Sequence, residues 1–425
     1  MNTEKHARLA ISGVQRLRAE PFPARGLIGW EEKAAVDAVF EQAIQAGSAP
    51  GYNGEEEDAY CQEFSAYMGG GFTDAVNSGT SAVYVSLKAL DLEPFSEVIV
   101  GAMTDPGGMM PIPLLNLIPI VADTCPGSFN TGPEQVQELI TSRTSAILIP
   151  HIAGEPADIE GIVQVANRYG LPVIEDCAQA HGARLNGRML GTFGSSAAFS
   201  TMGGKHHCSG GQGGLVFTRD KQMYQAVRRA SDRGKPFFML PGATNTTASL
   251  NFNLNDLAAA IGRVQLKKMP EGISRRKTIV AKLAEAIETL QAIALPELLP
   301  GAEPSYWFLR IRFQAERAAC DKETYCQALI AERLPVEPSY RGALPHLMDW
   351  FIHRRVFGSS GYPWASPAYT GDPQQQFPCP NAIAAVEQHF NLRFHENWSS
   401  ADIEDAISIF QKVDDAYAVE TPPGK

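Results

Sequence analysis

The chain lacks several patterns that would assign it to other classes of protein. It has no basic excess, because 47 acidic residues outnumber 36 basic ones and give a net charge of -11. Nucleic-acid binders need a basic face for phosphate contacts, so we expect no nucleic-acid partner. The apolar runs are too short to span a membrane, and residues 1–6 open no apolar leader segment. We therefore expect a cytoplasmic protein with no membrane partner.

Motifs for metals, disulfides and nucleotides are also missing. The seven cysteines are odd in number, and their spacings fit neither a zinc ribbon nor a redox CxxC pair, which predicts free thiols in a reducing compartment. His206 and His207 are adjacent, but no third ligand stands at a convincing spacing, so we predict no metal site and expect the two histidines to line a site or to pack. The chain contains neither a GxGxxG motif after a first strand nor a P-loop, which leaves dinucleotide and P-loop functions without support.

The chain does show short apolar runs that alternate with helical patterns, as in an α/β protein. The 425 residues are long enough for two or three domains, or for one large domain with a smaller appendage, and a composition of 44% hydrophobic and 20% charged residues is ordinary for a soluble enzyme. Short, continuously apolar runs predict strands over 97–101, 118–123, 145–151, 172–176, 197–201 and 214–218. Helical patterns between them cover 80–90, 133–140 and 159–169. This order predicts a mainly parallel sheet, whose ligands gather at the carboxyl ends of the strands.

The pattern changes after residue 220. Helices are predicted over 221–233, 255–267 and 273–290, and the segment 234–249 between the first two reads as a loop. An alternating strand over 305–313 opens a second, smaller α+β domain, with helices over 322–332 and 400–413. Residues 343–380 are rich in turns and are expected near the mouth of the site. The division is an N-terminal arm (1–28), a large cofactor-binding domain (29–254), and a connecting helix with a small domain (255–425).

Lys205 and Asp176 are the two candidate catalytic residues. Lys205 follows a predicted strand and is surrounded by small and glycine residues, which suits a buried amine that forms a Schiff base with an aldehyde cofactor. Asp176 ends an earlier strand, where its carboxylate would hold a pyridinium nitrogen protonated. Considered alone, a lysine is usually solvated and an aspartate of this kind usually caps a helix. Together they are the pair that pyridoxal phosphate (PLP) requires.

Other polar residues are placed to complete such a site. Gly79, Thr80 and Ser81 stand where turn residues lead into a helix, and a helix N-terminus attracts a phosphate. A plain N-cap is the alternative for this turn alone. Ser200 ends a strand and could add a phosphate contact, while Gln179 could meet the phenolic oxygen of the cofactor.

Four ordered motifs carry a resemblance to a known family. They are SGTSA (78–82), IEDCAQAHGA (174–183), FSTMGGKHHCSGGQGG (199–214) and NFNLNDLAAAIGRVQL (251–266). In this order they resemble the PLP-dependent sugar aminotransferases of the DegT/DnrJ/StrS type, over about residues 29–413. The resemblance implies a fold type I PLP-transferase: a large, mainly parallel α/β domain with a smaller C-terminal α+β domain.

The resemblance also implies roles for individual residues. Lys205 matches the Schiff-base lysine, Asp176 the pyridinium partner and Gln179 the residue near the phenolic oxygen. Gly79, Thr80, Ser81 and Ser200 match phosphate ligands, and Asn251 matches an asparagine that reaches the phosphate from the neighbouring subunit of a homodimer.

The implied reaction is a ping-pong transfer. Its amino donor is expected to be glutamate or glutamine, and its acceptor a nucleotide-linked keto sugar or a keto-cyclitol. Two alternatives remain. One is a dehydratase-like enzyme, although those relatives carry histidine in place of the lysine, and the other is a non-catalytic PLP-binding regulatory protein.

The chain departs from the family pattern at five positions. Asp105 stands where an aromatic residue usually stacks on the cofactor ring, Gln212 replaces the acid of GEGG, and Asn253 replaces an arginine. His206 and His207 follow the lysine, where apolar or Asn-Leu-like residues are usual. We expect these residues on the substrate side, which predicts an unusual acceptor.

Overall fold

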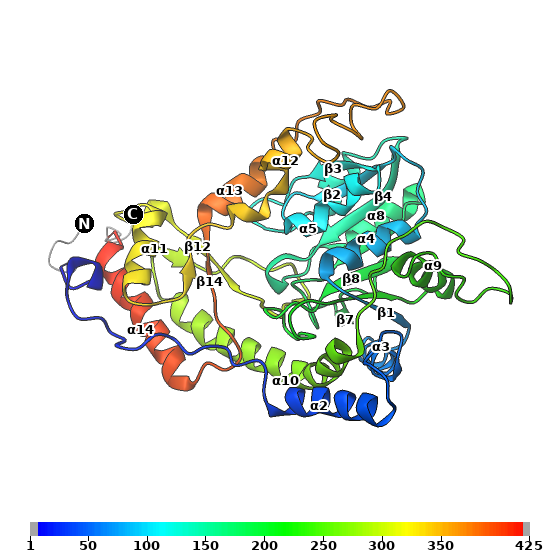
Figure 1. The fold of residues 1–425 in the computed structure, drawn as a ribbon. Coiled ribbons are helices and arrows are strands. Elements are labelled where there is room, and N and C mark those ends of the chain that lie inside the picture. Colours follow the sequence, from blue (N-terminus) through cyan, green and yellow to red (C-terminus); the bar gives the residue numbers. More distant parts are fainter. Residues whose placement is uncertain (1–6, 420–425) are drawn as a thin grey trace.

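A seven-stranded sheet forms the centre of the large domain (Figure 1). The computed structural model describes residues 7–419, so the N-terminal segment 1–6 considered above lies outside the described residues. The strands run in the order β1-β9-β8-β5-β4-β2-β3. Their bounds are β1 (Phe72–Val76), β2 (Glu97–Gly101), β3 (Ile118–Ala122), β4 (Thr144–Pro150), β5 (Val173–Asp176), β8 (Ser196–Ser200) and β9 (Gly214–Thr218). Only β9 runs against its two neighbours, and the strands from β8 to β3 are parallel.

Helices cover this sheet and supply its connections. They are α4 (Gly79–Ala89), α5 (Pro106–Met109), α6 (Pro111–Leu114), α7 (Pro133–Gln137), α8 (Ile159–Tyr169) and α9 (Lys221–Ser231). Their ends follow local chemistry: in α8, Asp158 accepts a hydrogen bond from the N–H of Gly161 (3.0 Å), and Gly170 ends the helix in the left-handed region. The strands are buried along nearly their whole length, as their continuous apolar runs predicted.

One long helix connects the two domains. α10 (Asp256–Ile287) has 32 residues and continues through Pro270, so the two helical stretches predicted on either side of that proline are one helix. Figure 1 shows it along the lower edge of the molecule, beside α2 (Trp30–Gln45) and α3 (Glu55–Tyr67). It contributes to both hydrophobic cores, with Leu266 and Met269 in the first and Ile279 and Leu283 in the second.

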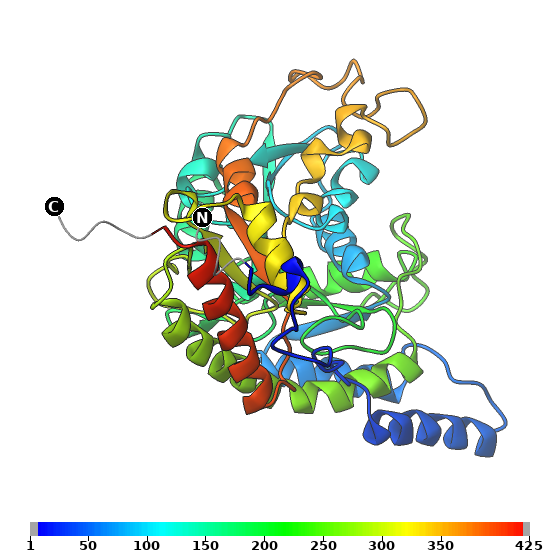
Figure 2. The same ribbon diagram turned by 90° about the vertical axis from the view of Figure 1, so that its left-hand side faces the viewer.

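The smaller domain is built on a four-stranded antiparallel sheet of order β10-β12-β14-β13. These strands are β10 (Ile293–Ala294), β12 (Leu309–Phe313), β13 (Val336–Glu337) and β14 (His389–Leu392). Its helices are α11 (Lys322–Ala331) and α14 (Ser400–Tyr417), with α12 (Asp349–Ile352) and α13 (Pro380–Gln388) extending toward the large sheet (Figure 2). A three-stranded ribbon joins β6 (Arg184–Leu185), β7 (Arg188–Met189) and β11 (Ala302–Glu303). The 3-10 turns are η1 (Ala10–Ser12), η2 (Ile152–Gly154), η3 (Ala315–Arg317), η4 (Arg341–Ala343) and η5 (Pro345–Leu347).

This arrangement confirms the expected fold type I architecture, with a mainly parallel sheet and a second α+β sheet. The domain boundaries at 28/29 and 254/255 stay predictions. Within residues 7–419, no helix combines the length and apolar character that a membrane span requires. All seven cysteines are free thiols.

Candidate active site

A cavity of about 210 Å³ lies where the parallel strands end. β5 and β8 are neighbours and end at Asp176 and Ser200, so both residues reach the same edge of the sheet, as predicted. The N-terminus of α4 and the short helix α5 complete the walls. The lining residues are Ser78, Gly79, Thr80, Val83, Asp105, Gly107, Gly108, Asp176, Ala178, Ser200, Met202, Lys205 and Gln212.

Asp176 offers one carboxylate to this cavity. Its Oδ1 accepts a hydrogen bond from the backbone N–H of Ala178 at 3.0 Å, which fixes the carboxylate at the strand end. Burial raises its pKa, and the N–H of Ala178 and the nearby Lys205 act in the opposite direction. Gly108 packs closely against this carboxylate, since a Cβ there would lie 2.9 Å from Asp176 Oδ2. The buried carboxylate therefore needs a cationic partner, and a protonated ring nitrogen would be one.

Lys205 faces the same cavity from a tight turn after β8. Its backbone N–H donates to the carbonyl of Met202 at 2.9 Å, and its Nζ lies 3.9 Å from the ring centroid of Trp307. Burial lowers the pKa of the Lys205 amine from 10.5 to about 8, although Asp176 and Asp105 favour its charged form. A large fraction of this amine is therefore neutral near pH 8, which is the form that attacks an aldehyde.

The cavity wall formed by the N-terminus of α4 is suited to an anion. β1 ends at Val76, and α4 begins three residues later with Gly79, so Ser78, Gly79 and Thr80 bring the first turn of a helix to the cavity. A Cβ on Gly79 would lie 2.6 Å from the Cβ of Ser200, which places Ser200 against this turn. Free N–H groups and hydroxyls at a helix N-terminus form a phosphate site.

Three of the predicted site residues do not line the cavity. Ser81 turns back and donates from its Oγ to Asn77 Oδ1 at 2.6 Å. Gln179 is buried beside the cavity, where its Oε1 accepts from the N–H of Ala153 and its Nε2 donates to Tyr340. Asn251 is exposed and accepts hydrogen bonds from Asn253. The roles predicted for these three residues stay predictions.

The expected placement of the residues after the lysine on the substrate side is wrong. His207 is fully buried behind the turn, where its Nε2 lies 2.7 Å from the Tyr60 hydroxyl and its Nδ1 lies 3.1 Å from Nδ1 of His181. The Nε2 of His206 lies 3.2 Å from the carbonyl oxygen of Ser305. Burial lowers the pKa of His207 to about 3, so it is neutral at ordinary pH. Both imidazoles pack under the lysine turn instead of facing a substrate.

Two other departures do reach the cavity. Asp105 lines it at the position expected for a stacking aromatic, and its Oδ1 accepts from the N–H of Gly107 at 2.9 Å, which caps α5. Gln212 also lines the cavity. Asn253 does not, because its Nδ2 donates to Asn251 at 2.6 Å. The cavity therefore has a carboxylate and an amide where the family pattern has an aromatic ring and an acid.

Glu175, next to Asp176, supports the fold. Its carboxylate accepts hydrogen bonds from three backbone N–H groups, at 2.7–2.8 Å: those of Gly191, Phe193 and Gly194. With His151 and Cys177 it forms a buried group whose atoms could in principle bind a metal ion. However, His151 Nδ1 already accepts from the N–H of Ala157, and its Nε2 lies 3.3 Å from Glu175. These donors and acceptors satisfy one another, which explains the cluster without an ion.

Trp307 is a site residue that the sequence reading missed. It lies near the start of the segment 305–313, whose alternating pattern predicted a strand and no site residue. Its ring lies against Lys205 Nζ, and its Nε1 donates to the carbonyl of Gly204 at 3.0 Å. A signal was present in the run Tyr306-Trp307-Phe308, because three consecutive aromatic residues cannot all face one side of a strand.

Comparison with known proteins agrees with this geometry. The family described as DegT/DnrJ/EryC1/StrS aminotransferase matches residues 31–411. The chain is 30% identical to the dTDP-3-amino-3,4,6-trideoxy-alpha-D-glucose transaminase of Streptomyces venezuelae over 66% of this chain and 73% of that protein. It is 33% identical to the L-glutamine:2-deoxy-scyllo-inosose aminotransferase of Streptomyces fradiae, over 65% and 67%. The structure of S. venezuelae DesV in complex with a ketimine intermediate superposes with a TM-score of 0.77 at 26% identity, covering 93% of this chain and 98% of that one.

Proposed function

Since the chain belongs to the DegT/DnrJ/EryC1/StrS aminotransferase family, we propose that it transfers an amino group from glutamate or glutamine to a keto sugar or keto-cyclitol. It is a transaminase, the activity that the names of two of its relatives state. The names of two relatives support the substrate classes, since one acts on a dTDP-sugar and the other pairs L-glutamine with an inosose. A nucleotide-linked sugar is therefore the first acceptor to test, followed by a keto-cyclitol.

The observation that carries this proposal is the composition of the cavity. It holds an amine with a lowered pKa, a buried carboxylate and a helix N-terminus within one space of about 210 Å³. PLP presents an aldehyde, a ring nitrogen and a phosphate, so each group of the cofactor has a partner of matching chemistry. We propose that Lys205 holds the aldehyde carbon, Asp176 the ring nitrogen, and Gly79, Thr80 and Ser200 the phosphate.

The residues then have distinct tasks. Bound PLP supplies an electron sink for the α-carbon of the amino donor. Lys205 Nζ would take the proton from that α-carbon and pass it to the aldehyde carbon of the cofactor, and would reverse this transfer in the second half of the reaction, which requires the amine to exchange protons near neutral pH. Asp176 would keep the ring nitrogen charged, since burial raises the pKa of this carboxyl and a protonated ring nitrogen beside it would stabilise the carboxylate form. Trp307 and the surrounding burial hold Lys205 out of water.

The two alternatives are less well supported by the site. A dehydratase-like enzyme of this type carries histidine in place of the lysine, but here Lys205 faces the cavity and His206 packs against Ser305. A non-catalytic regulatory protein would not require an amine with a lowered pKa at the cofactor site. Both alternatives make different predictions in the experiment below.

We further propose that the enzyme works as a homodimer in which Asn251 serves the site of the neighbouring subunit. Two observations support this: Asn251 does not line the cavity of its own chain, and the adjacent Leu250 is 61% exposed. A dimer interface would cover this apolar residue. Mixing the inactive variants Lys205→Ala and Asn251→Ala tests the idea, because subunit exchange would restore one intact site per mixed dimer. Without any recovery of activity, Asn251 acts within its own subunit or has no role.

The full-length protein with PLP tests the main proposal. We expect a visible absorption band that Lys205→Ala lacks, and we expect borohydride to remove the band while it attaches the cofactor covalently to the peptide containing Lys205. Glutamate or glutamine should bleach the band and release the corresponding keto acid. A band that no amino donor changes would leave the regulatory alternative, and acceptor dehydration without amine transfer would favour the dehydratase alternative. A protein that binds no PLP would refute all three.

A further inference from the structure

The N-terminal arm reaches the turn that carries Lys205. Arg25, on the arm, donates from its guanidinium to the backbone carbonyls of three consecutive residues: Gly204 (3.1 Å), Lys205 (2.7 Å) and His206 (3.3 Å). A guanidinium has five N–H donors in a rigid plane, so one side chain can hold several neighbouring carbonyls in a fixed relation. The backbone of the cofactor lysine is therefore held by a residue about 180 positions earlier in the chain.

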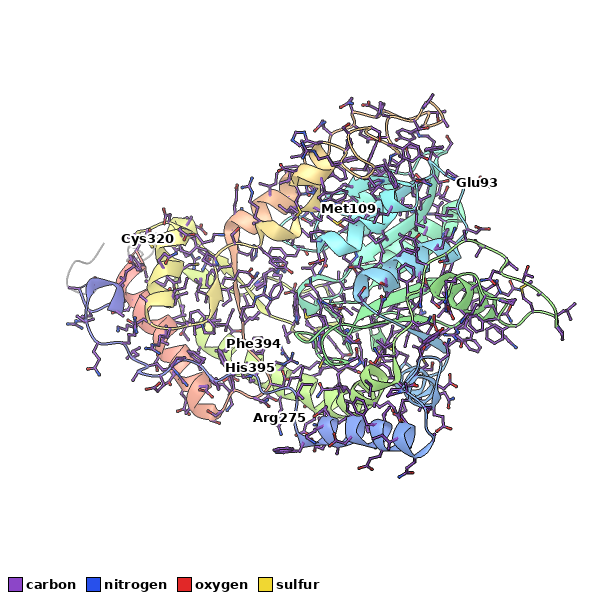
Figure 3. All side chains as sticks on the ribbon, in the orientation of Figure 1. Glu93, Met109, Arg275, Cys320, Phe394 and His395 are labelled. Atoms are coloured by element: carbon purple, nitrogen blue, oxygen red, sulfur yellow. The ribbon has the colours of Figure 1, made fainter. Side chains whose placement is uncertain are left out.

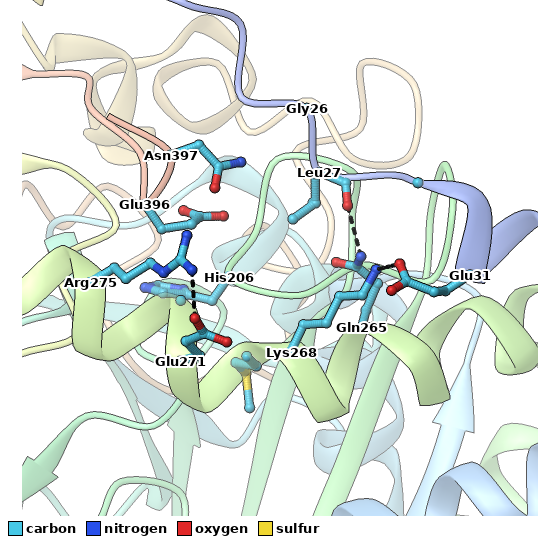
Figure 4. Close-up of a pocket in the computed structure, with 13 residues that line it drawn as sticks. Gly26, Leu27, Glu31, His206, Gln265, Lys268, Glu271, Arg275, Glu396 and Asn397 are labelled. Atoms are coloured by element: carbon cyan, nitrogen blue, oxygen red, sulfur yellow. Dashed lines mark hydrogen bonds and ion pairs between the residues drawn. The ribbon is translucent and has the colours of Figure 1, made fainter. Parts of the chain in front are cut away.

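The small domain in turn holds Arg25 in place. Its Nε donates to Glu396 Oε1 at 2.9 Å, and Asn397 Nδ2 donates to the Arg25 carbonyl at 2.5 Å. His395 Nε2 lies 2.8 Å from the carbonyl of Pro23, two residues earlier on the arm. Figure 4 shows Gly26 and Leu27 of the arm at the edge of a pocket of about 450 Å³ that Glu396, Asn397 and His206 also line. Arg25 thus connects the arm, the lysine turn and the small domain.

A second arginine extends this connection to the ring that faces the lysine amine. Arg276, on α10, binds the other oxygen of Glu396 at 2.8 Å and donates to the carbonyls of Tyr306 (2.8 Å) and Trp307 (3.3 Å). It also donates to the carbonyl of Phe394 at 3.4 Å, and Figure 3 shows Phe394 and His395 beside α10. One carboxylate therefore couples the backbone on both sides of the contact between Lys205 and Trp307.

The contact between Trp307 and Lys205 connects the two segments that Arg25 and Arg276 hold. The indole Nε1 of Trp307 donates to the Gly204 carbonyl, which Arg25 also contacts, and the indole ring lies 3.9 Å from Lys205 Nζ. The amine is held in this buried place only while the turn and the indole keep their relative positions. Once the turn relaxes, the amine gains water, and water favours its protonated form.

We propose that Arg25 is a positioning residue that fixes the Lys205 turn against Trp307, so that the N-terminal arm helps to set the reactivity of the cofactor lysine. The expected effect of Arg25 on PLP binding rests on the proposed function, whereas its expected effect on the protonation of the Lys205 amine does not. Arg25 touches neither the cavity nor the reacting atoms, and it acts through the backbone of Lys205.

Three variants separate this role from simple docking of the arm. Arg25→Met removes the donors, and Arg25→Lys restores a cation that can reach fewer carbonyls at once. Arg18→Met is the matched control, because Arg18 lies on the same arm but pairs with Asp402 and Asp405 at 2.7 Å, on α14. It loosens the arm without touching the lysine turn.

The first readout needs no cofactor. Trace acetic anhydride labels the full-length chain between about pH 6 and pH 11, and mass spectrometry of the Lys205 peptide gives the midpoint of its labelling curve. We expect Arg25→Met to raise this midpoint by about one pH unit or more, a tenfold change in the protonation equilibrium, with Arg25→Lys in between. Arg18→Met should match the wild type. The midpoint depends on protonation and not on how accessible the amine becomes.

The second readout is PLP binding, followed by absorbance. We expect Arg25→Met to weaken binding at least tenfold and Arg18→Met to leave it unchanged. Equal labelling midpoints in the wild type and Arg25→Met would overturn the proposal, and so would an equal shift in Arg18→Met. If Arg25→Met does not fold, Arg25→Lys decides by the same criterion. A wild type that binds no PLP would refute the proposed function, while the labelling curves would still test the role of Arg25.

Discussion

Replacing Lys205 with methionine should change how stability depends on pH. Methionine has a similar length and no charge, so the substitution removes the titrating amine while filling most of its space. In the folded protein without cofactor, burial lowers the pKa of this amine to about 8, against 10.5 when it is exposed in the unfolded chain. Between these two values the unfolded chain binds a proton that the folded chain does not.

The sign and size follow from this difference. Because the unfolded state binds more protons in this window, the free energy of unfolding of the wild type rises as pH rises from about 8 to about 10.5. The full rise is about 3 kcal/mol, at about 1.4 kcal/mol per pH unit. Below about pH 8 the amine is protonated in both states, and the wild type bears the whole cost of a buried charge. The methionine variant bears none of it.

Urea unfolding of the protein without cofactor, followed by tryptophan fluorescence, measures this difference. The free energy of unfolding of the wild type minus that of Lys205→Met should rise by about 3 kcal/mol between about pH 7 and about pH 11. Other groups titrate in both proteins and cancel. Lys33→Met is the control, because the Lys33 side chain is 58% exposed, and its difference should stay flat. A flat difference for Lys205→Met, or one that falls with pH, would refute the reasoning.

Three further substitutions test the geometry around the site. Gly79→Ala would place a methyl group 2.6 Å from the Cβ of Ser200, so the helix N-terminus must shift, and PLP affinity measured by absorbance titration should fall at least about tenfold. Glu175→Gln keeps one acceptor oxygen but turns an NH2 group toward at least one of the buried N–H groups, and it should lower the free energy of unfolding in urea by about 2–4 kcal/mol. Arg310→Met leaves the Glu155 carboxylate buried without its cation, which lies 2.8 Å away, and should cost about 3–5 kcal/mol by the same measurement, part of which Arg310→Met with Glu155→Met should restore. An unchanged affinity or stability in any of these variants would contradict the contact concerned.

The sequence predicted the strands that carry the site because they are continuously apolar. β5 and β8 were placed within a residue of their observed ends, and the rule for parallel sheets brought Asp176 and Ser200 to one edge. Within the seven-stranded sheet, the strand that the prediction missed is β1, which has a buried carboxylate in its middle. Asp74 interrupts the apolar pattern and is neutralised by Arg228, which lies 154 residues further along the chain. A pattern read over a short window cannot show such a partner.

The roles of Lys205 and Asp176 could be predicted from the sequence, because both follow predicted strands and lie among small residues that leave room for a cofactor. The residues that surround the lysine amine and hold its backbone could not be predicted in this way. Trp307 and Arg25 reach it from segments about 100 and 180 residues away, through contacts that depend on packing between domains. The same packing placed His207 in the core, although Lys205, two residues earlier, faces the cavity. Local pattern therefore determined which groups are present, while tertiary structure decided which of them meet and how much water remains around the amine, and burial has the largest effect on its pKa.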